Sequence, residues 1–275
     1  MNPHNPILPD PEKGLFAGVR ELVSDALFAK PSSHRFCSKG GAKELAAKNS
    51  ENLNLTLLIE TMWKQIVANW VEGGCQWRGS KNWHWTVNPT LNGEEVRKVD
   101  NEVRLNRLLI RQLGRQGWAN EVPTGSGMGR EGEKEPGGLD LAHCTNEGHL
   151  IMVELKTRGN PVEAAFQLVT YALLLNLARL VHHRLVPTGK PSKIDDRWLR
   201  GKKADLFVVA PAGFYEGFRT LRWFEQELGA ALKKFHSPAR NLAMSFKFRE
   251  FNDGLLKAPQ ADEFLRCIDR PVDWS

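Results

Sequence analysis

The sequence predicts an α/β protein in which helices flank a mixed sheet, with a helical extension at the N-terminus. Two observations lead to this prediction. Between residues 96 and 251 the hydrophobic periods follow the order helix, strand, strand, strand, helix, strand, and a sheet covered by helices is the layered arrangement that buries such a pattern. The 275 residues are 41% hydrophobic and 25% charged, which is the composition of a globular protein long enough to bury a sizeable core.

Two helices are expected in the extension, residues 1–95. Apolar residues recur at helical spacing within residues 16–27 and again within residues 51–72. Gly73 and Gly74 follow the second repeat, and glycine is the usual residue just past a helix end.

A tryptophan-rich segment, residues 75–87, closes the extension. Three of the nine tryptophans fall within nine residues there, among Arg78 and Lys81. Aromatic rings beside cations suit stacking on nucleic-acid bases and contact with phosphates. A strand that packs Trp83 and Trp85 against the domain from one face explains the segment as well. The second interpretation is favoured, and the first stays open.

The first helix of the α/β region is expected over residues 96–117, with a basic outer face. Glu102 lies on or beside its apolar stripe, where an unpaired carboxylate is costly. Pairing with Arg104 or Asn106 on the same helix is one explanation for this placement.

Three strands should follow, over residues 118–122, 139–144 and 150–156. Residues 123–136 are rich in glycine and charge and predict a loop beside the site. Asn146-Glu-Gly predicts a hairpin turn between the second and third strands.

The remaining elements complete the sheet and its cover. Residues 162–182 are apolar nearly all round, which predicts a buried helix. Residues 190–203 read as a basic loop, residues 205–210 as a buried strand and residues 216–235 as an amphipathic helix. Strict alternation over residues 246–251 predicts an edge strand.

The residues that carry chemistry fall in three of these elements. Asp140 ends a glycine-rich turn. Glu154 and Lys156 are two apart on a predicted strand, so they share one face. Gln167 and Tyr171 are four apart on a predicted helix, so they also share one face.

The succession Gly-x-x-Asp140, Glu154-x-Lys156-Thr and Gln167-x-x-x-Tyr171 resembles the PD-(D/E)XK phosphodiesterase superfamily, most closely its RecB-like branch. The three motifs span residues 137–171, and the flanking patterns extend the resemblance from about 96 to 251. The resemblance implies a restriction-endonuclease-like αβββαβ core in residues 96–275.

The resemblance also implies roles for particular residues. Asp140 and Glu154, with the backbone carbonyl of Leu155, would bind Mg²⁺ or Mn²⁺, for which oxygen ligands are suited. Lys156 would orient the attacking water and hold its developing negative charge. Glu102 is the best match for a glutamate that the family directs from its first helix toward the metal.

Contacts to nucleic acid are expected from both neutral and basic residues. Gln167 and Tyr171 would position the nucleic-acid backbone or the lysine, and Arg158 lies close enough in sequence to contact phosphate. Further phosphate contacts are expected from the basic loop, at Arg197, Arg200, Lys202 and Lys203.

Charge and composition narrow the partners. The net charge of +6 and the isoelectric point near 9.2 favour polyanions. No apolar run is long enough for a membrane span and no signal peptide is recognisable, so a cytoplasmic protein is expected. The sequence offers no phosphate-cradling glycine loop for a nucleotide cofactor, and its four scattered cysteines predict neither a zinc site nor an iron–sulfur cluster. Formation of a homodimer stays open.

Two functions therefore remain. The first is a metal-dependent nuclease that hydrolyses phosphodiester bonds of DNA with a metal- and lysine-activated water. The second is a non-catalytic nucleic-acid-binding protein that retains the nuclease fold. Endonuclease and exonuclease activity are not distinguishable from the sequence.

Overall fold

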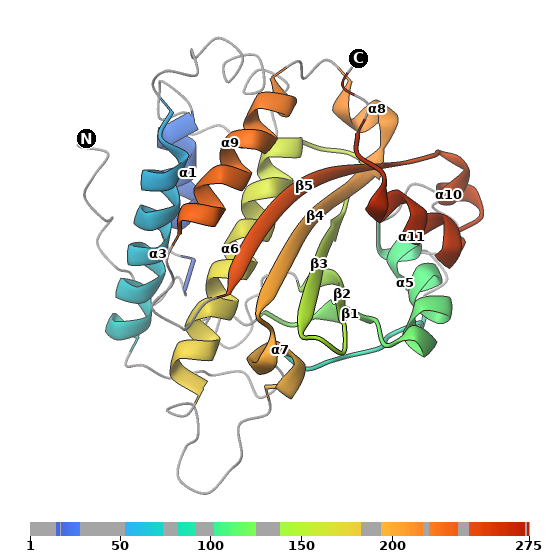
Figure 1. Ribbon diagram of the computed structural model, residues 1–275, viewed down its shortest axis with the longest axis horizontal. Coiled ribbons are helices and arrows are strands. Elements are labelled where there is room, and N and C mark those ends of the chain that lie inside the picture. Colours follow the sequence, from blue (N-terminus) through green and yellow to red (C-terminus); the bar gives the residue numbers. More distant parts are fainter. Residues whose placement is uncertain are drawn as a thin grey trace, which may run out of the picture.

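The computed structural model describes residues 15, 16, 18–27, 53–73, 82–91, 102–124, 138–182, 194–216, 220–235, 242–272 and 274. A twisted sheet of five strands crosses the molecule, and helices lie against both of its faces (Figure 1). The predicted α/β class with a mixed, helix-flanked sheet is therefore confirmed.

The five strands lie side by side in the order in which they occur along the chain. They are β1 (Ala119–Val122), β2 (Leu139–Cys144), β3 (His149–Leu155), β4 (Lys203–Pro211) and β5 (Ala243–Phe251). The first three pair antiparallel, whereas β3, β4 and β5 pair parallel. The carboxyl ends of β3, β4 and β5 therefore meet at one edge of the sheet.

The long helix α6 (Pro161–Val181) connects β3 to the second half of the sheet. Its start is well specified, because the Asn160 side chain accepts hydrogen bonds from the backbone N–H groups of Val162 and Glu163 and Pro161 occupies the first turn. It is the one helix in the described ranges that is long and apolar enough to cross a membrane, and 83% of that apolar window is buried. It therefore serves as the central helix of the core, as predicted.

Three more helices cover the same face of the sheet as α6: α1 (Val19–Leu27), α3 (Leu55–Glu72) and α9 (Leu221–Lys234). The helices predicted for the extension are thus confirmed. Their apolar residues join those of α6 and the sheet in a single hydrophobic cluster (Figure 1). The predicted boundary at residue 95 falls within residues 92–101, outside the described part of the chain.

The opposite face carries α5 (Glu102–Leu113), the short turn η2 (Gly114–Gln116), α10 (Gly254–Lys257) and α11 (Ala261–Asp269), around a second, smaller cluster. Gln112 joins α5 to α11, since its side chain accepts from Ala261 N and donates to the Pro259 carbonyl. The C-terminal helices α10 and α11 follow the last element that the sequence analysis predicted.

The described part of the tryptophan-rich segment, residues 82–87, packs against the domain, and residues 75–81 lie outside the described part of the chain. Trp83 N donates to the Pro123 carbonyl over 2.6 Å, and Asn120 N donates to the Thr86 carbonyl over 2.9 Å, so residues 82–91 run beside β1. The rings of Trp83 and Trp85 both contact Trp198, at 5.3 and 5.0 Å between centroids. Trp83 is fully buried, so packing rather than base stacking accounts for it.

The basic stretch predicted as a loop over residues 190–203 is partly regular, and that prediction was wrong for its described part, residues 194–203. Residues 196–200 form α7 (Asp196–Arg200), because the Asp195 side chain caps Arg197 N and the buried Trp198 anchors the turn. The strand predicted at residue 205 already begins at Lys203. The helix predicted over residues 216–235 begins only at Leu221, as α9, and the short helix α8 (Ala212–Tyr215) precedes the predicted range.

β5 is an edge strand, as predicted, and its outer side is covered. The carboxylate of Glu225 on α9 accepts from Phe248 N over 2.7 Å and from Lys247 Nζ over 2.9 Å. Farther along the strand, Arg249 forms an isolated antiparallel bridge with Pro271. A buried side chain and a returning segment of chain thus occupy hydrogen-bonding positions that an edge strand leaves open.

Candidate active site

Two carboxylates face each other where β2 and β3 pair. Leu141 pairs with Val153 in antiparallel register, so Asp140 lies opposite Glu154. The Asp140 Oδ2 atom accepts a 2.7 Å hydrogen bond from Leu155 N, which fixes one side of the carboxylate. Glu154 is only 1% exposed. The structure thus brings Asp140 and Glu154 together on neighbouring strands, as predicted.

Lys156 brings two further elements to these carboxylates. Its backbone N–H donates to the Val209 carbonyl, which places it just past the end of β3. Its Nζ atom lies 2.7 Å from Glu154 Oε1 and 3.4 Å from Glu102 Oε2. Glu154 and Lys156 therefore do not lie on an exposed face of the strand, because the Glu154 carboxylate is buried and the Lys156 side chain is only 17% exposed.

Glu102 reaches this cluster from the first turn of α5. Besides the contact with Lys156, its Oε1 atom accepts from Thr157 N over 3.1 Å. Pairing within its own helix does not occur, because Arg104 donates to the Leu256 carbonyl and Asn106 to the Asp140 carbonyl. Glu102 thus joins Glu154 and Lys156 from a third element of the fold.

Burial dominates the electrostatics of the acids. It raises the pKa of Asp140 to about 6, against the lowering effects of Lys156 and of the Leu155 N–H. It likewise raises the pKa of Glu154 well above its ordinary value, with a further rise from the charge of Asp140. Both carboxylates are therefore disfavoured as anions unless a cation is close.

Lys156 shows the opposite balance. Burial lowers the pKa of its ammonium, but the carboxylates of Glu154, Asp140 and Glu102 together raise it above the ordinary value. Lys156 is consequently held in the protonated state, and it is the cation on which the three acids converge.

Gln167 and Tyr171 face the cluster from α6. The Gln167 Nε2 atom donates to the Tyr171 hydroxyl over 3.0 Å, as their spacing on one helix face allows. Burial raises the pKa of the Tyr171 hydroxyl, and the charge of Glu154 raises it further. The phenol is therefore neutral beside Glu154.

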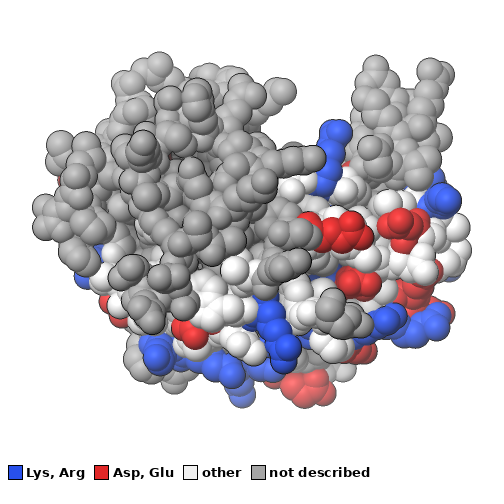
Figure 2. All heavy atoms as spheres, turned by 90° about the horizontal axis from the view of Figure 1, so that it is seen from above, with Lys and Arg blue, Asp and Glu red and all other residues white. Residues whose placement is uncertain are grey.

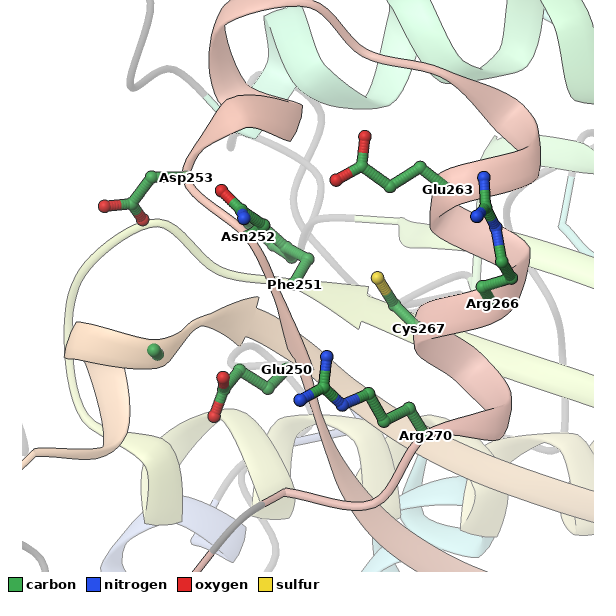
Figure 3. A pocket seen from close by; sticks show the side chains of 9 residues that line it. Glu250, Phe251, Asn252, Asp253, Glu263, Arg266, Cys267 and Arg270 are labelled. Carbon is green, nitrogen blue, oxygen red and sulfur yellow. The ribbon is translucent and has the colours of Figure 1, made fainter.

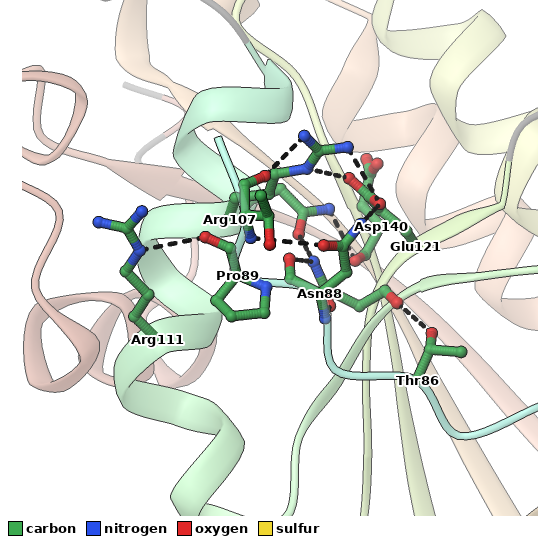
Figure 4. A network of polar contacts seen from close by, with 10 residues as sticks. Thr86, Asn88, Pro89, Arg107, Arg111, Glu121 and Asp140 are labelled. Carbon is green, nitrogen blue, oxygen red and sulfur yellow. Dashed lines mark hydrogen bonds and ion pairs between the residues drawn. The ribbon is translucent and has the colours of Figure 1, made fainter. Parts of the chain in front are cut away.

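A buried polar network that was not predicted from the sequence binds the backbone of Asp140 (Figure 4). The Asn106 side chain donates to the Asp140 carbonyl over 2.8 Å and accepts from Asn120 Nδ2 over 2.8 Å. Asn120 also exchanges hydrogen bonds with the backbone of Asn88. The signal for this network was the asparagine in the apolar stripe of α5, which is 2% exposed.

The same network continues to the molecular surface. Arg107 forms a two-atom contact with the Glu121 carboxylate, at 2.7 and 3.3 Å, and Asn88 donates to that carboxylate over 2.7 Å (Figure 4). Arg111 and Arg107 also donate to the carbonyls of Pro89 and Thr90. Two cations predicted on the basic outer face of this helix thus bind the segment 82–91.

The residues predicted to contact phosphates are divided between the two ends of β3 and β4. Arg158 is exposed and follows the cluster directly. The other four lie at the opposite end of the strands, about 16 Å away along β4; they are Arg197, Arg200, Lys202 and Lys203. The structure therefore brings only Arg158 to the acids and Lys156.

Three of those four have side-chain contacts. The Arg200 Nε–H donates to the Asp196 carbonyl over 3.5 Å. The Arg197 guanidinium lies over the Trp85 ring at 4.7 Å and 3.6 Å from the Asp195 carboxylate. The Lys203 ammonium lies 3.3 Å from Asp205. Arg197 remains 44% exposed and Lys203 54% exposed, so both can still meet solvent or a ligand.

The cluster suits a hard cation with few protein ligands. Across the described ranges, no three His, Cys, Asp or Glu side chains are gathered so as to hold a metal ion. Asp140 and Glu154 are nevertheless opposed, and Glu154 Oε2 is a buried oxygen without a hydrogen-bond partner. Mg²⁺ is typically bound through one or two carboxylates, with waters and substrate phosphates completing its shell. The chemistry of this donor set therefore fits Mg²⁺ or Mn²⁺.

No family model matches the chain, and no curated protein or solved structure matches it either.

Proposed function

We propose that the chain is a metal-dependent deoxyribonuclease with a restriction-endonuclease-like core of the PD-(D/E)XK type. The observation that carries the proposal is the ammonium of Lys156, which is surrounded by Glu102, Asp140 and Glu154 from three different elements. Three acids, of which Glu154 is fully buried, hold one lysine at the end of a sheet, and such arrangements are characteristic of functional sites.

Asp140 and Glu154 are the residues that would hold the divalent ion, with the Leu155 carbonyl beside them in sequence. A divalent ion in this position supplies positive charge for the phosphate oxygens and lowers the pKa of a water. The hydrogen bond from Leu155 N holds the Asp140 carboxylate in place, and the Asn106 side chain holds its backbone. The carboxylate therefore needs little rearrangement to act as a ligand.

Lys156 would act as a donor and a positive charge rather than as a base, because the surrounding carboxylates keep it protonated. Its ammonium can hold the oxygen of the attacking water and compensate the negative charge that develops during attack. Gln167 and Tyr171 present neutral donors from α6 on the same side of the sheet, where they would contact the substrate backbone.

Nucleic acid is the substrate class that the net charge favours. The net charge is +6. Figure 2 views the molecule from above, the end toward which β4 and β5 run, and acidic and basic side chains alternate in the described part of that face. Binding there would rest on local contacts such as Arg158 rather than on a continuous basic surface.

The test is incubation with linear, circular and single-stranded DNA in Mg²⁺, Mn²⁺ or EDTA. We expect cleavage that requires the divalent ion and disappears in Asp140→Asn. Asp205→Asn is a matched control, because Asp205 lies on the same sheet but at the other end of β4. DNA binding without cleavage in any metal would instead support the non-catalytic nucleic-acid-binding function.

A further inference from the structure

A solvent-open cavity with a mixed polar and apolar lining lies at the same edge of the sheet as the candidate active site. It has a volume of about 630 Å³ and lies between the end of β5 and α11 (Figure 3). Phe251, Cys267 and Ala212 line its interior, while its charged lining consists of Glu250, Asp253, Glu263, Arg266 and Arg270. The volume lies within the range of sites that bind small molecules or single nucleotides.

The register of the parallel strands places this cavity beside the acids. Glu154 pairs with Val208 on β4, and Glu250 pairs with Ala210, two residues farther along the same strand. Two strand spacings and two residues correspond to roughly 12 Å between the backbones of Glu154 and Glu250. By alternation, Glu250 and Glu154 start from the same face of the sheet, whereas Phe251 and α11, which form the other wall of the cavity, belong to the opposite face. The cavity and the acids therefore share the carboxyl edge of the sheet.

The acidic and basic side chains that line the cavity do not pair with one another. Within the described residues, no ion pair joins the carboxylates of Glu250, Asp253 or Glu263 to Arg266 or Arg270. Arg266 donates its Nε–H to the Asp262 carbonyl, which leaves its terminal nitrogens available. Arg270 reaches from the end of α11 toward β5 and Glu250 (Figure 3). The cavity therefore offers both donors and acceptors to a ligand.

A nucleotide has the complementary set of groups. Guanidinium groups bind phosphate oxygens through paired N–H donors. Carboxylates accept hydrogen bonds from the exocyclic amino groups of bases. Thymine has no such amino group. A purely anionic ligand would be repelled by the three acids, whereas a base with an amino group would be bound by them.

We propose that this cavity binds one nucleotide of a single-stranded segment of the substrate, a short distance along the strand from the bond that is cleaved. Arg270 and Arg266 contact its phosphate, and Glu250 and Asp253 contact the amino group of its base. The cavity thus prefers cytosine, adenine or guanine over thymine. This inference rests on the proposed nuclease function, since it assigns a subsite of the same substrate.

The experiment measures binding in EDTA, where no cleavage occurs, with labelled oligo(dC) and oligo(dT) of equal length at pH 7.5. We expect oligo(dC) to bind at least about fivefold more tightly, which corresponds to the lower end of the discrimination by one base contact. The double substitution Glu250→Gln with Asp253→Asn should make the two affinities equal. The double substitution Arg266→Ala with Arg270→Ala should weaken both oligonucleotides to a similar extent.

Matched controls separate local from general charge effects. Glu60→Gln on α3 and Arg222→Ala on α9 change exposed residues on the helices that cover the opposite part of the molecule, and both should keep the preference for oligo(dC). Equal affinities in the wild-type protein would overturn the proposal. So would a preference that persists in the Glu250 and Asp253 variant.

The outcome is independent of catalysis. A preference that depends on the cavity in a protein without metal-dependent cleavage would refute the nuclease function and leave the nucleotide site standing. Cleavage that requires Asp140 but is indifferent to the cavity variants would refute the nucleotide site alone.

Discussion

The two ends of the parallel strands hold similar charged residues in opposite electrostatic states. At the carboxyl end, burial raises the pKa of Asp140 and of Glu154, and one oxygen of Glu154 lacks a hydrogen-bond partner. At the amino end, Asp205 accepts from Ser245 and lies 2.6 Å from His149 Nε2 and 3.3 Å from Lys203 Nζ. The carboxylates at the carboxyl end are therefore disfavoured as anions, whereas the carboxylate at the amino end is stabilised as an anion by its partners.

The difference shows how to separate a functional site from a structural one on the same sheet. Burial also tends to raise the pKa of Asp205, but the hydrogen bond from Ser245 and the charges of His149 and Lys203 lower it below the ordinary value. A carboxylate with such partners contributes to stability. Carboxylates that share one cation and remain disfavoured as anions are instead suited to bind an additional cation.

The largest effect should come from the lysine. We expect Lys156→Ala to reduce DNA cleavage by at least about 10²-fold, because the charge that compensates the attacking water is lost. Lys203→Ala, which removes a comparable lysine beside Asp205 at the other end, should leave cleavage within twofold of wild type. Single-turnover cleavage at a temperature where circular dichroism shows both variants folded provides the measurement. Equal losses in the two variants would break the comparison.

The second effect is a gain in stability at Asp140. Its pKa is raised from 3.8 to about 6, so its contribution to stability is complete below pH 4 and is lost as the pH rises through 6. The shift corresponds to about 3 kcal/mol at pH 8. In EDTA, Asp140→Asn should therefore be more stable than wild type at pH 8 and no more stable at pH 4, by urea denaturation. A destabilised variant at pH 8 would contradict the raised pKa.

Asp205→Asn should have the opposite effect and lower the stability of the protein at neutral pH. The lowered pKa of Asp205 means that its contribution to stability is present above its ordinary pKa and is lost as the pH falls through the lower value in the folded protein. We expect a loss of roughly 1 kcal/mol at pH 7, as for one buried hydrogen-bonding group. The difference from wild type should shrink as the pH falls below the ordinary aspartate pKa. Denaturation curves across this range, recorded in parallel with those of the Asp140 variant, test both signs.

The smallest effect concerns DNA binding at the two ends. The logarithm of the association constant for DNA falls linearly with the logarithm of the salt concentration. Each phosphate contact contributes roughly 0.9 to that slope. Arg158→Ala should reduce that slope by about one contact, because Arg158 adjoins the acids. Arg200→Ala, in α7 at the other end, should reduce it less. Equal reductions in anisotropy titrations would mean that bound DNA spans both ends of the strands.

Local periodicity was sufficient to predict most of the elements. The helix around residues 162–182 was identified because its apolar residues surround it, and α6 is buried accordingly. The opposed pair Asp140 and Glu154 followed from strand alternation and from the resemblance to a known family. Tertiary contacts decided what sequence left open, namely that Glu102 pairs with Lys156 and Thr157 rather than within its own helix.

Features that depend on distant partners were not predictable. The basic stretch before β4 read as a loop because its charges dominate, whereas the buried Trp198 and the cap from Asp195 determine the helix. Asn120 reads as an ordinary strand residue until Asn88 and Asn106 are found on either side of it. The cavity beside α11 combines residues of β5, α8 and α11, and no spacing along the chain reports such a combination.

The two edge strands of the sheet, β1 and β5, are covered, which limits how this protein can associate with other chains. Glu225 occupies the outward Phe248 N–H of β5, and residues 82–91 donate to and accept from the backbone beside β1. Neither a peptide strand nor a second copy can extend the sheet at these positions without displacing those groups. Assembly with itself or with another protein would then proceed through side chains on helices and loops. Glu225→Ala, by uncovering β5, should favour aggregation by intermolecular strand pairing, which light scattering would detect.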